Sequence, residues 1–127
     1  MVETVQPHMI VVETSGVAEP GPLVSEFSLI GVRTDSVITV VDAENIDRFY
    51  KENETARRQI EEADFVVINK TDLVSPQKLV DLERLLRKLN DRALLLTSSY
   101  GQVRETFFLP TVWRDTSVGR AGLPRLQ

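Results

Sequence analysis

Short apolar runs alternate along the chain with longer segments whose apolar residues recur at helical spacing. The runs are rich in valine, isoleucine and leucine, which is typical of strands buried on both faces of a sheet. They cover residues 9–12, 36–41, 65–68 and 93–96. The helical spacing recurs over residues 23–30, 43–53, 55–62 and 76–89. This alternation predicts an α/β fold with a mainly parallel sheet that carries helices on both faces.

The clearest helix boundary is Ser75-Pro76, where a capping serine precedes a proline at the first helical position. Residues 17–22 are rich in proline and glycine, and this composition predicts no regular element there. Toward the C-terminus the sequence becomes polar and loses its periodicity. We therefore predict one domain over residues 1–109 and a weakly ordered tail over residues 110–127.

Composition narrows the class of protein further. The 127 residues carry a formal net charge of -4 without a basic run, so we expect no binding to nucleic acid or to an acidic membrane surface. No apolar run approaches the ~20 residues that span a bilayer, and the polar N-terminus does not resemble a signal peptide. The sequence contains no cysteine, which excludes disulfides and thiolate metal sites within it. These features predict a cytoplasmic protein.

Each predicted strand is followed by a polar residue, in order Glu13, Asp42, Asn69 and Thr97. The carboxyl ends of parallel strands meet at one edge of a sheet, and ligands of open α/β sheets bind there. The pattern therefore predicts that the four loops form a binding site. Asp42 has a structural alternative, because an acidic residue at this position can cap the helix that follows.

The strongest of these signals is Asn69-Lys70-Thr71-Asp72. The Asp72 carboxylate can accept hydrogen bonds from the N1–H and the exocyclic amine of guanine, whereas adenine presents the wrong donors. A partner left unpaired in such a site costs about 1–3 kcal/mol, so this residue can discriminate between the bases. Asn69 can tie neighbouring loops together, and the stem of Lys70 can lie along the base. The four-residue motif alone is equally compatible with a solvated polar turn.

Glu13-Thr14-Ser15-Gly16 follows the first predicted strand in the same way. A carboxylate at Glu13 can meet the hydration shell of Mg²⁺ in a phosphate site. Gly16 has no Cβ, so its backbone N–H can closely approach a γ-phosphate. The alternative is an ordinary turn in which Gly16 adopts a positive φ, and these residues alone favour that alternative.

Two further segments have features of the same kind of site. Ser98 and Ser99 follow the fourth predicted strand, and their hydroxyl and N–H groups can meet the guanine O6, although serine-rich turns are common. Gly16 to Gly21 has the glycine spacing of a phosphate loop. It is interrupted by proline and is followed by Pro22 where a lysine is required, so it is not a Walker A loop.

Taken in order, three segments resemble the CobW family of GTPases, which are metallochaperone-type P-loop proteins related to the urease and hydrogenase nickel-insertion GTPases. The segments are residues 11–20, 37–43 and 59–73. In that family a glutamate begins the third GTPase motif, and Glu13 matches it. The resemblance implies part of a P-loop NTPase fold, Rossmann-like with three layers and a mainly parallel sheet.

The resemblance also implies an activity and assigns roles to residues. It implies that GTP is bound and hydrolysed with Mg²⁺, and that this cycle delivers Zn²⁺, another transition metal, or Co²⁺ for cobalamin synthesis to a client protein. The catalytic residues would be Glu13 and Gly16, with Glu13 meeting Mg²⁺ through water. The nucleotide-binding residues would be Asn69, Lys70, Asp72, Ser98 and Ser99.

The sequence also departs from the family pattern. Members carry a G-x-x-x-x-G-K-[ST] phosphate loop and a Cys-x-Cys-Cys motif before the Glu13 strand, and nothing in this sequence matches either. We therefore expect a piece of a longer GTPase that also lacks the family's C-terminal domain. Such a piece is expected to bind GTP poorly and to self-associate through an exposed sheet edge. Two alternatives stay open, a truncated Rossmann-like interaction module without catalysis and a relative of the nickel-insertion GTPases.

Overall fold

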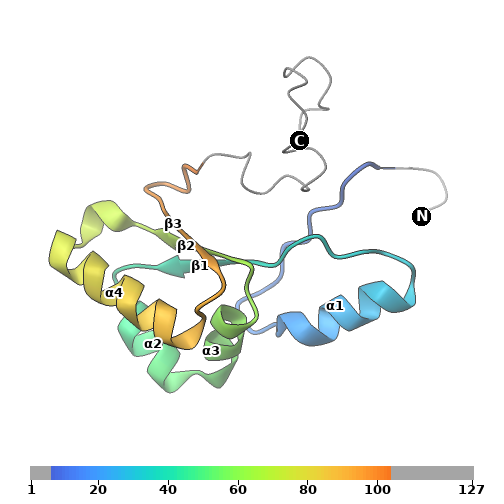
Figure 1. The fold of residues 1–127 in the computed structure, drawn as a ribbon, viewed down its shortest axis with the longest axis horizontal. Helices are drawn as coiled ribbons and strands as arrows, with labels where there is room; N and C mark the ends of the chain where they lie inside the picture. Colours follow the sequence, from blue (N-terminus) through green and yellow to red (C-terminus); the bar gives the residue numbers. More distant parts are fainter. Residues whose placement is uncertain (1–6, 104–127) are drawn as a thin grey trace, which may run out of the picture.

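The computed structural model describes residues 7–103, which form a small sheet with its helices (Figure 1). In chain order the elements are α1 (Pro20–Leu29), β1 (Ile38–Asp42), α2 (Ile46–Glu52), α3 (Glu54–Glu61), β2 (Phe65–Asn69), the 3-10 helix η2 (Thr71–Leu73), α4 (Pro76–Leu89) and β3 (Leu94–Thr97). Strands alternate with helices from β1 onward, which confirms the predicted α/β class. The predicted tail at residues 110–127 lies outside the described residues.

The three strands form one parallel sheet in the order β1-β2-β3. Ile38 is opposite Phe65, which is in turn opposite Leu94, so the three strands start in register and end at the same edge. Residues 65–68 of the central strand β2 are all buried, as their continuous apolar run predicts. The loops after β1, β2 and β3 therefore lie next to one another.

Helices α2, α3 and α4 cover one face of this sheet (Figure 1). Side chains of alternate strand residues point into that face, and the helices supply the rest of the core. The buried cluster consists of Val41, Ala43, Ile46, Ile60, Ala63, Val66, Ile68, Leu82, Leu86 and Ala93. Val40, which alternates with Val41 on β1, is 64% exposed. The buried cluster between the sheet and the helices therefore lies on the face of β1 that carries the Val41 side chain.

The predicted strand at residues 9–12 is wrong for this structure, because no strand precedes β1 among residues 7–103. Ile10, Val11 and Val12 are 57%, 75% and 52% exposed, and none of the three strands pairs with them. A β-branched run favours extended backbone, but a strand also needs hydrogen bonds from a neighbouring strand. This run has no such neighbour and stays outside the sheet.

Helix α1 begins earlier than the composition of residues 17–22 predicts. Pro20 is its first residue and Pro22 lies within its first turn. Backbone N–H groups in the first turn have no partner within the helix, so proline is tolerated there and its fixed φ suits the helix. The prolines therefore start this helix. No residue of α1 is buried. Its first turn meets the C-terminal end of α3, where the N–H of Gly21 donates to the Glu62 carboxylate at 2.8 Å, and the rest of the helix extends away from α2 and α4 (Figure 1).

The two helical segments predicted at residues 43–53 and 55–62 correspond to α2 and α3, which are separated by Asn53, although α2 starts only at Ile46. The backbone of Asn53 is extended, with φ -133° and ψ 107°, and its Oδ1 accepts the N–H of Ala56 at 3.2 Å. This bond caps α3, since the first N–H groups of a helix lack partners within it. α4 begins after Ser75 and ends at Leu89, as predicted, and the Ser75 hydroxyl accepts the N–H of Lys78 at 3.2 Å.

A buried asparagine joins α3, α4 and the strands that follow each of them. Asn90 follows α4 and is 5% exposed. Its Nδ2 donates to the carbonyls of Ile60, Glu61 and Ala63 at 2.8, 3.1 and 2.9 Å. Its Oδ1 accepts the backbone N–H groups two and three residues later, at 3.0 and 2.9 Å. One side chain thus bonds to five backbone groups, at the C-terminal end of α3, just after it, and in the turn before β3.

Within residues 7–103, no helix combines the length and the apolar character that crossing a membrane requires.

Candidate functional site

Asn69 ties the loop after β2 to the loop after β3. Its Oδ1 accepts the hydroxyl of Ser98 at 3.1 Å and the backbone N–H of Gly101 at 3.0 Å. Ser98 is buried, and its backbone N–H donates to the carbonyl of Ile68 at 2.8 Å. The structure therefore brings Asn69 and Ser98 together at the carboxyl edge of the sheet.

Thr71 makes a second connection between the same two loops. Its backbone N–H and its hydroxyl both donate to the carbonyl of Ser98, at 3.1 and 2.9 Å. The same hydroxyl lies 3.3 Å from the hydroxyl of Ser99. Thr71 was not among the residues predicted for the site, although a hydroxyl side chain inside the motif was a usable signal. The side chains of Asn69 and Thr71 therefore both join the loop after β2 to the loop after β3.

Two residues beside these contacts have an unusual backbone. Among residues 7–103, Lys70 (φ 60°) and Tyr100 (φ 54°) are the non-glycine residues with positive φ. A non-glycine residue in the left-handed region costs of order 1–3 kcal/mol, and such residues cluster at binding and active sites. Both residues lie in the two joined loops. The two strained residues therefore lie in loops that the sequence predicts to form a binding site.

The ammonium of Lys70 bonds to the carboxylate of Asp42, with an Nζ–Oδ2 distance of 2.8 Å. The same carboxylate accepts the backbone N–H of Glu44 at 2.9 Å and the side-chain amide of Asn45 at 3.1 Å. α2 starts only at Ile46 with Asn45 as its N-cap residue, so Asp42 caps the preceding turn and not the helix. The Lys70 hydrogen bond is the main cause that lowers the pKa of Asp42, and Asp42 raises the pKa of Lys70.

We predict that the Asp42–Lys70 pair makes stability depend on pH. A carboxyl with a lowered pKa in the folded state stabilises the fold above its unfolded pKa, and this contribution is lost as pH falls through the folded pKa. Asp42→Asn should therefore be less stable than the wild type at pH 7, and the difference should shrink as the pH falls below 3.8, the ordinary pKa of an aspartate side chain. Urea unfolding of both proteins across this range measures the difference. A gap that stays constant down to pH 2 would contradict the prediction.

Asp72 lies in η2, directly beyond these contacts, and its side chain is exposed. It makes no hydrogen bond or ion pair with any other residue in the range 7–103. Its neighbours Lys70 and Thr71 are hydrogen-bonded to Asp42 and Ser98. These bonds hold the backbone on the N-terminal side of Asp72, while its carboxylate stays free to bind a ligand. The loop geometry is thus compatible with a carboxylate that pairs with a ligand.

The structure does not bring Glu13 and Gly16 to this edge of the sheet. Glu13 is exposed, and the carbonyl of Gly16 accepts the side-chain amide of Gln59 on α3 at 3.1 Å. No hydrogen bond or ion pair links residues 13–16 to residues 69–72 or 98–99 within the described part of the chain. In Figure 1 the segment leads directly into α1. Because residues 9–12 do not join the sheet, Glu13 does not lie at a strand end.

The described residues do not form a metal site by themselves. Residues 7–103 contain no group of three or more His, Cys, Asp or Glu side chains that could hold a metal ion. Glu13 is a single exposed carboxylate, whereas Mg²⁺ takes six oxygen ligands in near-octahedral geometry, several of them usually water. These residues therefore do not fit Mg²⁺ on their own, and no step of GTP hydrolysis is assigned to them.

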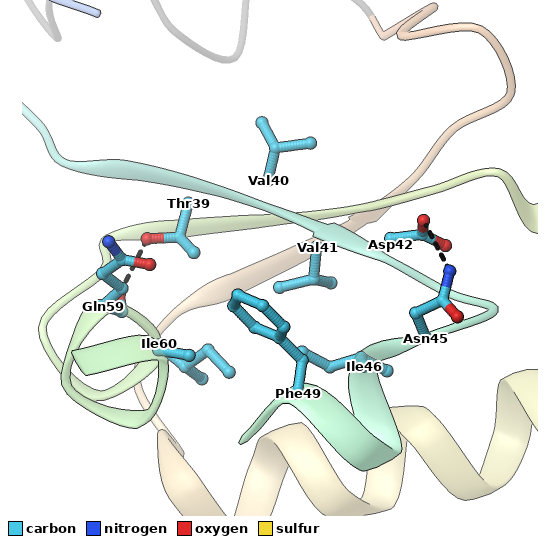
Figure 2. Close-up of a pocket in the computed structure, with 10 residues that line it drawn as sticks. Thr39, Val40, Val41, Asp42, Asn45, Ile46, Phe49, Gln59 and Ile60 are labelled. Atoms are coloured by element: carbon cyan, nitrogen blue, oxygen red, sulfur yellow. Dashed lines mark hydrogen bonds between the residues drawn. The ribbon is translucent and has the colours of Figure 1, made fainter. Parts of the chain in front are cut away.

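A pocket of about 350 Å³ opens at the free edge of β1, between this strand, α2 and α3 (Figure 2). Val41, Ile46, Phe49 and Ile60 form its apolar wall, while Asp42 and Asn45 lie at one end. The pocket does not include residues 69–72 or 98–99. It is therefore separate from the joined loops, although Asp42 borders both.

The sequence model of a protein family, the CobW/HypB/UreG nucleotide-binding domain, matches residues 1–97 of the 127. The chain belongs to this family. The CobW-family chain is 38% identical over 100 residues to the Zinc-regulated GTPase metalloprotein activator 1 of Schizosaccharomyces pombe, covering 74% of this chain and 24% of that protein. It is 30% identical over 104 residues to the Zinc chaperone YjiA of Escherichia coli, covering 78% of this chain and 32% of that protein.

A solved structure supports the fold of this CobW-family chain. The crystal structure of Zn(II)-bound YjiA GTPase from E. coli aligns with a TM-score of 0.61 and 29% identity, over 69% of this chain and 29% of that one. The three-stranded parallel sheet with its helices therefore matches part of a P-loop GTPase. The chain spans about a quarter to a third of the length of the two curated relatives.

Proposed function

We propose that this chain supplies the guanine-recognising edge of a GTP site in a GTPase that delivers zinc. In this proposal the Asp72 carboxylate accepts the N1–H and the exocyclic amine of guanine. Asn69 and Thr71 hold the loop after β3 in place, so that Ser98 and Ser99 border the base. The stem of Lys70 lies along the base while Asp42 holds its ammonium.

The observation that carries the proposal is the contrast between Asp72 and its surroundings. Asn69, Lys70 and Thr71 are all fixed by side-chain bonds between 2.8 and 3.3 Å, whereas Asp72 is exposed and unpaired among the described residues. A loop that is already ordered loses little conformational freedom when it binds a ligand. An available carboxylate on an ordered loop is therefore suited to reading the base of a nucleotide.

The zinc part of the proposal rests on the relatives. The names of the fission-yeast and E. coli proteins describe a zinc-regulated GTPase and a zinc chaperone, and a solved relative contains Zn(II). This chain has no cysteine, and residues 7–103 have no cluster of potential metal ligands. We therefore propose GTP recognition for these residues and zinc as the cargo of the GTPase, without a zinc site of their own.

The base preference of the 127-residue chain tests the proposal. We expect weak binding, because the sequence has no loop of the Walker A type to hold the phosphates. Titration of the ¹⁵N-labelled chain with GDP should move the amide signals of residues 69–72 and 98–101, and ADP at the same millimolar concentration should leave them unchanged. Equal shifts with both nucleotides, or none with GDP, would contradict the proposal. Micromolar affinity for GTP·Mg²⁺ by calorimetry would contradict the expected weakness.

A further inference from the structure

The outer edge of β3 has no neighbouring strand. β3 pairs with β2 on one side, and no other strand within residues 7–103 pairs with it. The N–H groups of Leu94 and Ser98 donate to carbonyls on the β2 side, at 2.9 and 2.8 Å. Successive residues of a parallel strand turn their backbone groups to opposite sides, so those of Leu95 and Thr97 point away from β2. β3 therefore presents the N–H and C=O groups of two residues to a further strand.

Helix α4 forms a groove together with this edge. Five side chains of α4, at spacings of three and four residues, lie on one face of the helix and line an open groove of about 640 Å³ with Leu95. They belong to Val80, Glu83, Arg84, Arg87 and Lys88. Val80 is 41% exposed, and Leu95 packs against the core while staying partly accessible. The groove thus offers apolar surface directly beside the free edge of β3.

The charged side chains that line the groove are mostly cationic. Arg84, Arg87 and Lys88 lie there with one acidic residue, Glu83. Arg84 lies 3.8 Å from Asp81 on an exposed surface, so this pair neutralises little of its charge. In the described part of the chain, neither Arg87 nor Lys88 forms an ion pair. The groove therefore carries a positive charge that the described residues leave largely uncompensated.

Arg87 is fixed at the end of the groove where β3 begins. Its Nη1 donates to the carbonyl of Ala93, the residue before β3, at 2.6 Å, and lies 3.5 Å from the carbonyl of Asp91. Nη2 and Nε make no hydrogen bond with residues 7–103, so the remaining donors of the guanidinium can meet a carboxylate. A side chain that is already held loses little freedom when it binds such a group.

We propose that β3 and α4 bind an extended acidic segment of a partner protein, which adds a strand to the sheet. The backbone of the segment pairs with Leu95 and Thr97. Neighbouring strands lie about 4.8 Å apart and turn alternate side chains to the same face, so every second side chain of the segment enters the groove. An apolar side chain there contacts Val80, and flanking carboxylates meet Arg87 and Lys88. This surface is separate from the proposed guanine-binding loops and does not depend on the proposed function.

Charge favours this occupant over two others. Residues 104–127 contain four arginines and two acidic residues, so the chain's own C-terminal segment has the same sign of charge as the groove. A second copy that paired edge to edge along β3 would bring two sets of cations together, and such like-charge contacts oppose association. An acidic segment of a different protein neutralises the cations.

Titration of the isotope-labelled 127-residue chain with synthetic peptides tests the proposal. The acidic probe is Ac-Glu-Thr-Val-Thr-Glu-Thr-amide, which places two carboxylates and one valine on the same side of a strand. It should shift the amide signal of Leu95 and the methyl signals of Val80 and Leu95. The same peptide with lysine in place of glutamate should leave these signals unchanged. An acidic probe with a fully N-methylated backbone should bind roughly tenfold more weakly, because it cannot donate to the edge of β3.

Lys88→Glu tests the role of charge, and Lys51→Glu is its matched control. Both lysines are exposed and lie in the last turn of a helix, so the two variants change the net charge and the interaction with the helix dipole alike. Lys88→Glu should weaken binding of the acidic probe roughly fivefold, because it replaces an attraction by a repulsion. Lys51→Glu should bind the probe as the wild type does.

The contrary results are equally specific. Unshifted Leu95 signals, or equal affinity for the acidic and lysine probes, would mean that the cations only protect the edge of β3 from pairing. Undiminished binding of the N-methylated probe would exclude strand addition, and equal weakening in both lysine variants would reduce the effect to net charge. Shifts of Leu95 on dilution without a probe, or contacts between its methyl groups and residues 104–127, would assign the groove to a second copy or to the chain's own C-terminal segment. Each of these outcomes overturns the proposal, and none involves a nucleotide, so the proposed function stands or falls separately.

Discussion

Replacing Asn90 by alanine is expected to lower the free energy of unfolding by about 3 kcal/mol. The substitution leaves three carbonyls, those of Ile60, Glu61 and Ala63, without the Nδ2 donor that now bonds them. It also removes the acceptor of two backbone N–H groups in the turn before β3. Buried backbone groups that lose their partners carry the full cost of desolvation, so this effect exceeds that of losing one surface bond.

Urea unfolding of the Asn90→Ala chain, followed by circular dichroism, measures this loss. Asn45→Ala is the matched control, because Asn45 is exposed and its side chain bonds only to Asp42 at 3.1 Å. We expect this control to cost less than about 1 kcal/mol. Asn90→Asp should remain strongly destabilised at pH 7, since it keeps an acceptor for the turn but faces three carbonyls with a carboxylate. Equal losses in Asn90→Ala and Asn45→Ala would contradict the assigned role.

Elements with complete local signals were predictable from the sequence, and elements that need a distant partner were not. α4 has a capping serine, a proline at its first position and leucines at helical spacing, so its bounds matched the prediction. The run at residues 65–68 is central and buried, as its composition indicates. Residues 9–12 have nearly the same composition but no neighbouring strand. Apolar composition fixes the preference for a strand, whereas its neighbours decide whether one forms.

The candidate site shows the same division. The motif at residues 69–72 and its position after a strand were visible in the sequence, and the parallel register then places Ser98 beside it. The two bonds from Thr71 to the Ser98 carbonyl depend on how two loops meet, which no local pattern reports. Gln59 likewise lies in an ordinary helical segment, and its amide bonds to the carbonyl of Ala18, 41 residues away. Contacts between distant segments therefore account for most of what the sequence did not predict.

Asp72→Asn is expected to change the preferred base from guanine to xanthine. Guanine presents two donors, its N1–H and its exocyclic amine, and the Asp72 carboxylate can accept both. An asparagine offers one acceptor and one donor, so its amide hydrogens would oppose a donor of guanine. Xanthine keeps the N1–H but has an oxygen in place of the amine, which matches the asparagine. Each mismatch costs about 1–3 kcal/mol, so the ratio of the two affinities should change by roughly tenfold or more.

Competition between GDP and xanthosine diphosphate, followed through the amide signals of residues 69–72, measures this ratio in the wild type and the variant. Asp81→Asn makes the same change on α4, where the carboxylate contacts Gln77 and Arg84 and not the candidate site, so its ratio should equal that of the wild type. A loss of GDP binding without a gain for xanthosine diphosphate would mean that Asp72 supports the loop without reading the base. The exposed position of Asp72 and its lack of partners within residues 7–103 argue against that purely structural role, because its carboxylate holds nothing in place.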